Sequence, residues 1–446
     1  MGCAQGGTPV SGEWLGVLSL AALFIAIFVG FPIAFTLIAV ALVFGYIEFG
    51  DIVFNLMTLQ FFSVMKDTTL AAVPFFLFMG FLLEQSGLMA RLFRATQLLL
   101  APLAGSLYLA IIGTATIFGM ASGIVGSSVT LLGVMAAPSI RKSGYDIRLA
   151  AGAITAGGTL GILIPPSVML VVMAPVVGVP VTELFSAAIV PGLMLSFLYC
   201  AYTTIRCHLN PKLGPPLRME ERRPSTYVLR ELAVGVVPML IVIFATLGTI
   251  MAGLATPTDC AAVGAFVTVL MVFAYKELTW QRLRYAVFAT LVMSSMILFL
   301  VAASNFFGAV FSRLGSATMI AESLLNLSLP PIVMLALILV IIFLLGWPLE
   351  WVPIVLIVVP ILLPLVQKLG INLVWFCTLV AVCLQTAWLS PPVALSAYFL
   401  KGVVPDWDLK DINAGMMQFM VLQLAGLALV LVFPQLALWL PAALRD

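Results

Sequence analysis

Residues 161–167 read GILIPPS and place two consecutive prolines in the middle of a run, 149–182, that contains no Asp, Glu, Lys or Arg. An apolar run of this length spans the hydrocarbon core of a bilayer as a helix. Proline has no backbone N–H, so Pro165 leaves the carbonyl of Gly161 without its helical donor, and the next proline does the same for Ile162. We expect a transmembrane helix broken near its centre, with carbonyl oxygens available to a cation. A kink formed for packing alone is the alternative.

The same arrangement recurs in the second half of the chain, where residues 387–392 read AWLSPP. Its two prolines follow those of the first half at an offset of 226 residues, and they leave the carbonyls of Ala387 and Trp388 without donors. Further landmarks keep this register: Pro138 with Pro364, Gly144 with Gly370 and, at an offset of 225, Pro32 with Pro257. A register shared by several prolines and glycines indicates that the two halves are copies of one fold.

The composition of the 446-residue chain fits a lipid bilayer as its solvent, because 63% of the residues are hydrophobic and 9% are charged. Further runs without a charged residue are long enough to span a membrane, among them 14–47, 232–258 and 412–444. The alternating pattern of a transmembrane barrel is missing, so the backbone polar groups must be satisfied inside helices. The sequence therefore predicts a multi-pass helical membrane protein.

A polar, glycine-rich segment interrupts the charge-free run 95–140, where residues 119–128 read GMASGIVGSS. From there to the end of the run about 12 residues remain, roughly 18 Å of helix, which is too short for a hydrocarbon core of about 30 Å. We therefore expect a re-entrant hairpin near 106–140, with its tip against protein or a water-filled cavity. The repeat register predicts a second hairpin near 331–365, entering from the opposite side because the halves are inverted.

The expected fold is an all-α integral membrane protein of two inverted-topology repeats, with about 10–11 transmembrane helices, two re-entrant hairpins and two proline-broken helices. Its segments are an N-terminal tail 1–13, a first repeat 14–205, a cytoplasmic linker 206–231, a second repeat 232–440 and a C-terminal tail 441–446. Residues 50–68 and 313–330 are interpreted as short outer loops.

The distribution of basic residues predicts the orientation, because Lys and Arg accumulate in short loops on the cytoplasmic side of a membrane. Placing residues 206–231 inside leaves only four of the 20 cations on the outer side: Lys66, Arg313, Lys368 and Arg445. We therefore expect the linker to face the cytoplasm and both termini to face outward.

Oxygen-bearing groups at the hairpin tips and helix breaks are the candidate ligands of a hard monovalent cation such as Na⁺, and no other metal is expected. They are Ser122, Gly123, Ser127, Ser128, Gly161, Ile162, Pro165, Gly346, Ala387, Trp388, Ser390 and Pro391. The serines of the first tip are alternatively small residues that ease helix contact. The half-helices beyond the breaks have positive dipole ends that can receive a carboxylate.

Acidic residues within a membrane are expensive to bury and therefore indicate function. Glu350 lies at the second tip, whereas Asp259 heads a predicted span and lies alternatively at the interface. Asn305 is expected to line the transport cavity, because it lies in a charge-free run. The candidate substrate or coupling residues are Asn305, Glu350, Thr256, Thr258, Asp259 and Ser167.

Other functional classes find little support in the sequence. It contains no nucleotide-binding loop, zinc-protease motif or nucleophile elbow, so ATP-driven pumping and catalysis are disfavoured. The six cysteines lack the spacing of a metal site, and neither a cofactor nor a nucleic-acid partner is expected. A channel would not need two opposed broken-helix sites. Secondary transport is therefore the favoured class.

Several motifs together carry a family resemblance: VPFF at 73–76, ASG at 121–123, SGYD at 143–146, AGGTLGILIPPS at 156–167, PG at 191–192, ATPTD at 255–259 and SPP at 390–392. Over nearly its whole length, the sequence resembles the large membrane subunit of a tripartite ATP-independent periplasmic (TRAP) transporter. The resemblance implies Na⁺-coupled uptake of small organic acids across the bacterial inner membrane by an elevator-like motion. It also implies two partners, a soluble periplasmic substrate-binding protein and a small four-helix membrane subunit.

The chain departs from the commoner pattern of that family in several places. The first tip carries IVG at residues 124–126, where many members have a shorter tip followed by an acid. Three side chains also differ from the usual type: Asp259 for Glu, Glu350 for Asp and Ser390 for Thr. These features resemble the branch associated with keto acids and related carboxylates. A self-sufficient Na⁺ or H⁺/anion symporter of similar inverted-repeat design is the alternative.

Overall fold

The computed structural model describes residues 12–216, 225–347, 349–391 and 394–444, and this part of the chain forms helices without a β-strand. The elements of the first half are α1 Gly12–Val29, α2 Ile33–Phe49, α3 Ile52–Lys66, η1 Thr69–Ala71, α4 Ala72–Gln85, α5 Leu88–Leu100, α6 Ser106–Ser122, α7 Val125–Ser143, α8 Ile147–Leu163, α9 Val168–Val177 and α10 Val181–Leu209. Those of the second half are α11 Ser225–Ile243, η3 Phe244–Gly248, α12 Thr249–Met251, α13 Pro257–Ala274, α14 Trp280–Arg313, α15 Ser316–Leu325, α16 Pro331–Leu345, α17 Trp351–Pro353, η4 Ile354–Val358, α18 Val359–Lys368, α19 Leu373–Ala387, α20 Leu395–Val403, α21 Leu409–Val432 and α22 Gln435–Ala443.

Several of the described helices are long and apolar enough to cross a membrane. Seven helical segments meet this condition alone, and the bent pairs α3 with α4 and α8 with α9 raise the number to nine in the described part of the chain. Four shorter apolar helices, α2, α6, α16 and α19, complete the set. The all-helical membrane fold expected from the composition is confirmed.

The register of the elements shows the two repeats. α7 begins 226 residues before α17, and α8 begins 226 residues before α19. Gly144 and Gly370, which lie in the turns before α8 and α19, both have a φ of +67°, a left-handed conformation that glycine adopts without strain. The repeats therefore agree in backbone conformation as well as in the positions of their prolines.

One pair of equivalent segments differs between the repeats. α3 and α4 meet at an angle of 59° on either side of a short turn, whereas α14 covers the equivalent residues of the second half as one helix of 34 residues. The interpretation of residues 50–68 as a short loop was therefore wrong, because Ile52–Lys66 form the helix α3. Residues 313–330 likewise contain α15.

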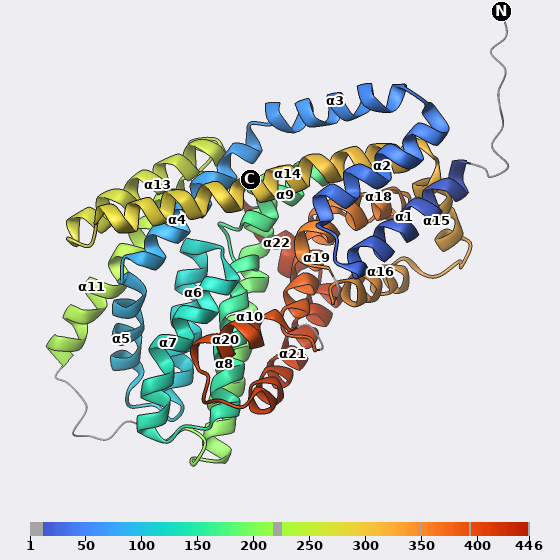
Figure 1. Ribbon diagram of the computed structural model, residues 1–446. Coiled ribbons are helices and arrows are strands. Elements are labelled where there is room, and N and C mark those ends of the chain that lie inside the picture. Colours follow the sequence, from blue (N-terminus) through green and yellow to red (C-terminus); the bar gives the residue numbers. More distant parts are fainter. Residues whose placement is uncertain (1–11, 217–224, 348, 392–393, 445–446) are drawn as a thin grey trace, which may run out of the picture.

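The helices pack in two groups (Figure 1). In the first, called the α14 group here, α14 packs against α2, α3 and α4, and α13 packs against α4. In the second, called the hairpin bundle and made of α6–α9 and α16–α21, α8 packs against α6, α7 and α21, and α19 packs against α16 and α21. Figure 1 shows the long α14 crossing the upper part of the molecule above α6, α8 and α20.

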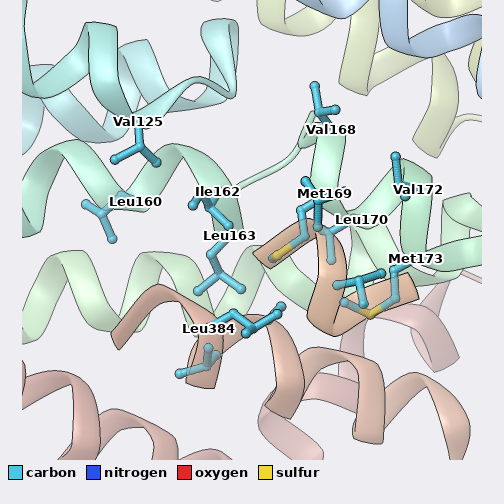
Figure 2. Packing of buried hydrophobic residues seen from close by; sticks show 14 of the residues in the cluster. Val125, Leu160, Ile162, Leu163, Val168, Met169, Leu170, Val172, Met173 and Leu384 are labelled. Carbon is cyan, nitrogen blue, oxygen red and sulfur yellow. The ribbon is translucent and has the colours of Figure 1, made fainter. Parts of the chain in front are cut away.

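The helix α8 lies at the centre of the hairpin bundle. All its residues from Leu149 to Leu163 are buried, as expected for a helix that is apolar on every face. Figure 2 shows how Leu160 and Leu163 of α8 lie between Val125 of α7 and Leu384 of α19. The broken helix is therefore surrounded by elements of both repeats.

Candidate functional site

The first proline break separates α8 from α9, which are bent by 41° relative to each other. Ile164 and Ser167, on either side of the cis Pro165-Pro166 bond, have extended backbones. The Ser167 hydroxyl donates a hydrogen bond to the Ile162 carbonyl. The expectation that this carbonyl is free was therefore wrong, because the turn brings a hydroxyl back to it. Pro165, four positions after Gly161, has no N–H to donate to the Gly161 carbonyl.

The first hairpin meets this break through glycines. Gly123, between α6 and α7, has a φ of +63°, and a Cβ added to it would lie 3.1 Å from the Pro166 carbonyl oxygen. A Cβ on Gly119 would lie 3.1 Å from the backbone nitrogen of Gly161. Side chains at these positions would push the hairpin off the break, so glycine permits the close backbone approach.

The serines of the first tip have different surroundings. Ser128 Oγ donates to the Ile124 carbonyl of its own helix at 2.7 Å. Ser127 Oγ is buried and has no hydrogen-bond partner among the described residues. The side chain of Ser122 lies outside the described part of the chain. Of the two described hydroxyls, that of Ser128 bonds within its own helix and that of Ser127 has no hydrogen-bond partner.

The second hairpin tip and the second break share a cavity of about 230 Å³. Four residues predicted from the sequence line it: Gly346, Glu350, Ala387 and Trp388. The other lining residues are Trp347, Leu349, Trp351 and Leu395. A carboxyl group and the end of a broken helix thus meet at one place, as the repeat register predicts.

Ser390 lies just beyond this cavity, in the turn that follows α19. Its buried hydroxyl donates to the Thr386 carbonyl at 2.8 Å and lies 3.1 Å from the sulfur of Met420 on α21. Pro391 follows in the turn, and Pro392 lies outside the described residues. The backbone N–H groups of Ser390 and Ser396 donate to the carbonyls of Ala387 and Trp388 at 3.3 and 3.4 Å, so the expectation that these two carbonyls lack donors was wrong.

Asn305 lines a separate cavity of about 430 Å³ between the two helix groups. One wall consists of α3, the turn that leads into η1, η1 itself and α14. The other wall consists of α9, η4 and α18. Polar lining residues missed by the sequence analysis are Gln60, Ser63, Asp67, Ser304 and Ser312. The spacing of the first three could have indicated them, since residues three or four positions apart share one helix face.

Thr256, Thr258 and Asp259 lie at the start of α13. Thr256 Oγ1 donates to Asp259 Oδ2 at 2.6 Å and accepts from the Asp259 backbone N–H at 3.2 Å, a reciprocal helix cap. Thr258 Oγ1 donates to the Thr68 carbonyl at 2.7 Å. The structure thus joins Thr256 to Asp259 and Thr258 to the α3–α4 turn, and none of these hydrogen bonds reaches the second tip.

Hairpins, broken helices and inverted repeats in a polytopic helical chain define the class as a membrane transport protein. A family model described as "Tripartite ATP-independent periplasmic transporter, DctM component" matches residues 20–436. The chain belongs to this family, and it is a permease subunit rather than an enzyme. The family resemblance drawn from the motifs is confirmed.

Characterised relatives and a solved structure extend over nearly the whole chain. The C4-dicarboxylate TRAP transporter large permease protein DctM of Rhodobacter capsulatus is 29% identical over 92% of this chain and 95% of its own length. The sialic acid TRAP transporter large permease protein SiaM of Vibrio cholerae is 30% identical, with 96% of both chains covered. A crystal structure of the Alcanivorax borkumensis YdaH transporter, described as having an unusual topology, has a TM-score of 0.65 at 15% identity and covers 96% of this chain and 98% of that one. That likeness shows the fold.

Proposed function

We propose that this chain is the membrane permease subunit of a Na⁺-coupled, binding-protein-dependent secondary transporter that imports small organic acids. The observation that carries the proposal is the meeting of a hairpin tip with a proline-broken helix in each repeat. Such sites offer carbonyl and hydroxyl oxygens to Na⁺ and half-helix N-termini to an anionic group. Two related sites allow ion binding and substrate binding to be linked.

The proposed substrate is a keto acid or another carboxylate. The two relatives described above are named for C4-dicarboxylates and for sialic acid, which are carboxylates. The cavity beside Asn305 is polar, and no Lys or Arg is among its described lining residues. The discrimination between acids is therefore proposed to reside mainly in the periplasmic binding protein.

The proposed mechanism is an elevator-type alternation in which the hairpin bundle moves against the α14 group. The 430 Å³ cavity lies between these two groups, where such a movement would open and close it. Both hairpins and both breaks belong to the hairpin bundle, so the bound ion and substrate would travel together. The contacts across the cavity would then differ between the two states.

The proposed assembly contains a periplasmic substrate-binding protein and a small four-helix membrane subunit in the bacterial inner membrane, with residues 206–231 in the cytoplasm. The tripartite description of the family supports these partners. The distribution of Lys and Arg supports the orientation.

Reconstitution into proteoliposomes tests the proposal. Vesicles with the full chain, the small subunit and the binding protein should accumulate a labelled keto acid or dicarboxylate when Na⁺ is supplied outside. Vesicles with the full chain alone should not. Accumulation by the isolated chain would favour a self-sufficient symporter, and equally fast uptake in choline buffer under a pH gradient would replace Na⁺ by H⁺.

A further inference from the structure

Basic side chains surround the turn between α13 and α14, where α5 passes. Glu277 in this turn accepts hydrogen bonds from Arg91 of α5 at 3.3 Å and from Arg282 of α14 at 2.5 Å. The Arg91 guanidinium also lies over the Tyr275 ring, 5.3 Å from its centroid. The Tyr275 hydroxyl donates to the Val234 carbonyl of α11 at 3.0 Å. These contacts hold α5, α11 and α14 together at one place.

Three further cations beside this bridge are exposed and have no ion pair among the described residues: Arg94, Lys276 and Arg284. Each lies within three positions of a member of the bridge, and we call the five cations Arg91, Arg94, Lys276, Arg282 and Arg284 the basic cluster. The segments that meet here contain six cations and three acids within residues 84–94, 230–234 and 275–285. The basic cluster therefore presents an excess of positive charge at the surface.

The backbone of Lys276 is a second reason to assign its charge a role. Its φ is +59°, in the left-handed region, which a non-glycine residue adopts at a cost of about 1–2 kcal/mol. Glycine would adopt this conformation without strain. A lysine at such a position is consistent with a use for its ammonium group that offsets the strain.

Exposed aromatic and apolar side chains place the basic cluster at the edge of the hydrocarbon core. Trp280, the first residue of α14, is 77% exposed, and Tyr285 is also exposed. Tryptophan and tyrosine gather at the level of the lipid head groups. Further along both helices, the exposed side chains are apolar: Phe266, Leu270 and Phe273 on α13, and Phe288, Leu291 and Val292 on α14. The turn lies at the left of the molecule in Figure 1, where the two helices meet. Acyl chains fit the apolar faces, and a head group fits the cluster.

The second repeat lacks the equivalent cations. α15 occupies the register of α5, and the residues 226 positions after Arg91 and Arg94 are Ala317 and Ile320. α5 buries one apolar face, which includes Leu92 and Phe93, and carries its two arginines elsewhere on the helix, as an interfacial amphipathic helix does. The charge is therefore a feature of the first repeat and of one side of the membrane.

We propose that Arg94, Lys276 and Arg284 bind the phosphate of an anionic phospholipid in the leaflet at this end of α14. Arginine and lysine bind phosphate through charge-assisted hydrogen bonds. A lipid with a net negative charge is favoured over a zwitterionic one, because the choline or ammonium group of the latter cancels the charge of its phosphate. α5 connects α4 of the α14 group to α6 of the hairpin bundle, so the bound lipid holds this connector against the α13–α14 turn. The site does not depend on the coupling ion.

Thermal unfolding of the purified full chain in detergent tests the site. The chain is titrated with phosphatidylglycerol or with phosphatidylcholine of the same acyl chains, and phosphatidylglycerol should stabilise it at the lower concentration. Arg94→Gln, Lys276→Gly and Arg284→Gln should each raise the phosphatidylglycerol concentration for half-maximal stabilisation about fivefold, which equals about 1 kcal/mol per cation. None of them should alter the phosphatidylcholine titration. Added salt should weaken the response to phosphatidylglycerol, because it screens exposed charges.

Two control variants remove an exposed cation elsewhere. Arg313→Gln lies at the opposite end of α14, and Lys212→Gln lies in the segment that follows α10. Both should respond to phosphatidylglycerol like the unchanged protein. Lys276→Gly carries the test if an arginine variant does not fold, because glycine relieves the left-handed backbone. Inorganic phosphate at the same concentration should not stabilise the chain, since it offers no acyl chain to the apolar faces.

Equal stabilisation by the two lipids would overturn the site, as would a phosphatidylglycerol titration that all three substitutions leave unchanged. Inorganic phosphate as effective as the lipid would show a site for a free anion and also overturn the proposal. A third contrary outcome is an unchanged lipid titration together with weaker co-purification of the small membrane subunit, which would assign the surface to a protein. Each of these results leaves the proposed transport function intact, because lipid binding is measured without uptake.

Discussion

Gln385 Nε2 donates a hydrogen bond to Thr159 Oγ1 at 3.1 Å, and the two residues are 226 positions apart. That separation is the repeat register, so the same position of each repeat touches its counterpart. Equivalent groups can meet only near the axis that relates the repeats, which must therefore pass between α8 and α19. Gln423 Nε2 of α21 donates to the same hydroxyl at 3.3 Å. A buried polar contact thus marks the centre of the hairpin bundle.

Removing the Thr159 hydroxyl should destabilise the protein. In Thr159→Val, the amides of Gln385 and Gln423 lose their common acceptor while the shape of the side chain is nearly kept. Hydrogen bonds within membrane proteins contribute about 0.6–1.7 kcal/mol each, so we expect a loss of about 1–3 kcal/mol in the free energy of unfolding. Unfolding in mixed detergent measures it.

Thr155→Val is the matched control, because the Thr155 hydroxyl bonds only to carbonyls of its own helix. It lies one turn earlier on α8 and is equally buried. Equal stability losses in the two variants would contradict the role assigned to the contact on the axis.

The fit of the first hairpin against the first break should depend on Gly123. In Gly123→Ala, the alanine would have to adopt a left-handed backbone conformation, and its Cβ would lie 3.1 Å from the Pro166 carbonyl oxygen. In Gly144→Ala, the backbone φ would be similar, +67° against +63°, but no atom lies within 4 Å of the added Cβ. The left-handed backbone alone costs about 1–2 kcal/mol. We expect Gly123→Ala to lower the melting temperature and the Na⁺-driven uptake more than Gly144→Ala does, and equal effects would argue against the close approach.

The main breaks of the fold could be predicted from the sequence because they arise from local backbone chemistry. Pro165 and Pro391 remove N–H donors wherever the chain places them, and Gly144 and Gly370 allow a left-handed turn in both repeats. The constant offset between such residues can be recognised even in a highly apolar sequence, because proline and glycine occupy their positions for backbone geometry and not for hydropathy alone. The two repeats and the positions of their broken helices could therefore be predicted from the sequence.

The finer parts of the site depend on the path of individual turns and on contacts between remote segments, which the spacing of residues does not reveal. The Ser167 hydroxyl returns to Ile162 only because of the path of the turn between them. Gly123 lies at the tip of the first hairpin and Pro166 in the break, and their close approach follows from the packing of α6 and α7 against α8. The ATPTD motif was singled out for its acid, yet the cap between Thr256 and Asp259 explains it locally.

Loss of the Ser390 hydroxyl should weaken Na⁺ coupling without unfolding the protein. This hydroxyl lies at the second break, beside a carbonyl of α19 and Met420 of α21. Ser390→Ala should raise the Na⁺ concentration for half-maximal uptake about threefold to tenfold, equal to about 0.7–1.4 kcal/mol of ion binding. Uptake in reconstituted vesicles measures it. Ser186→Ala is the control, because the Ser186 hydroxyl donates to carbonyls of its own helix, α10. An unaltered Na⁺ dependence would remove Ser390 from the candidate ligands.

Glu350 and Asp259 should behave differently when each is replaced by its amide. Glu350 lines the cavity at the second tip, so Glu350→Gln should change the ion concentration needed for uptake. Asp259 accepts a hydrogen bond from Thr256 at the start of α13, so Asp259→Asn should cost up to about 1 kcal/mol of stability and leave the ion dependence unchanged. The reverse pattern would return Asp259 to the coupling machinery.

Cysteine labelling should place residues 206–231 in the cytoplasm. In a version without the six native cysteines, Pro215→Cys should react with an impermeant maleimide only after the inner membrane is permeabilised. Pro180→Cys, exposed in the turn between α9 and α10, should react in intact cells made permeable at the outer membrane. The expectation follows from the loops rich in Lys and Arg, which the charge rule assigns to the cytoplasm. Labelling of position 215 from outside would invert the orientation of both repeats, and the first hairpin would then enter from the periplasm.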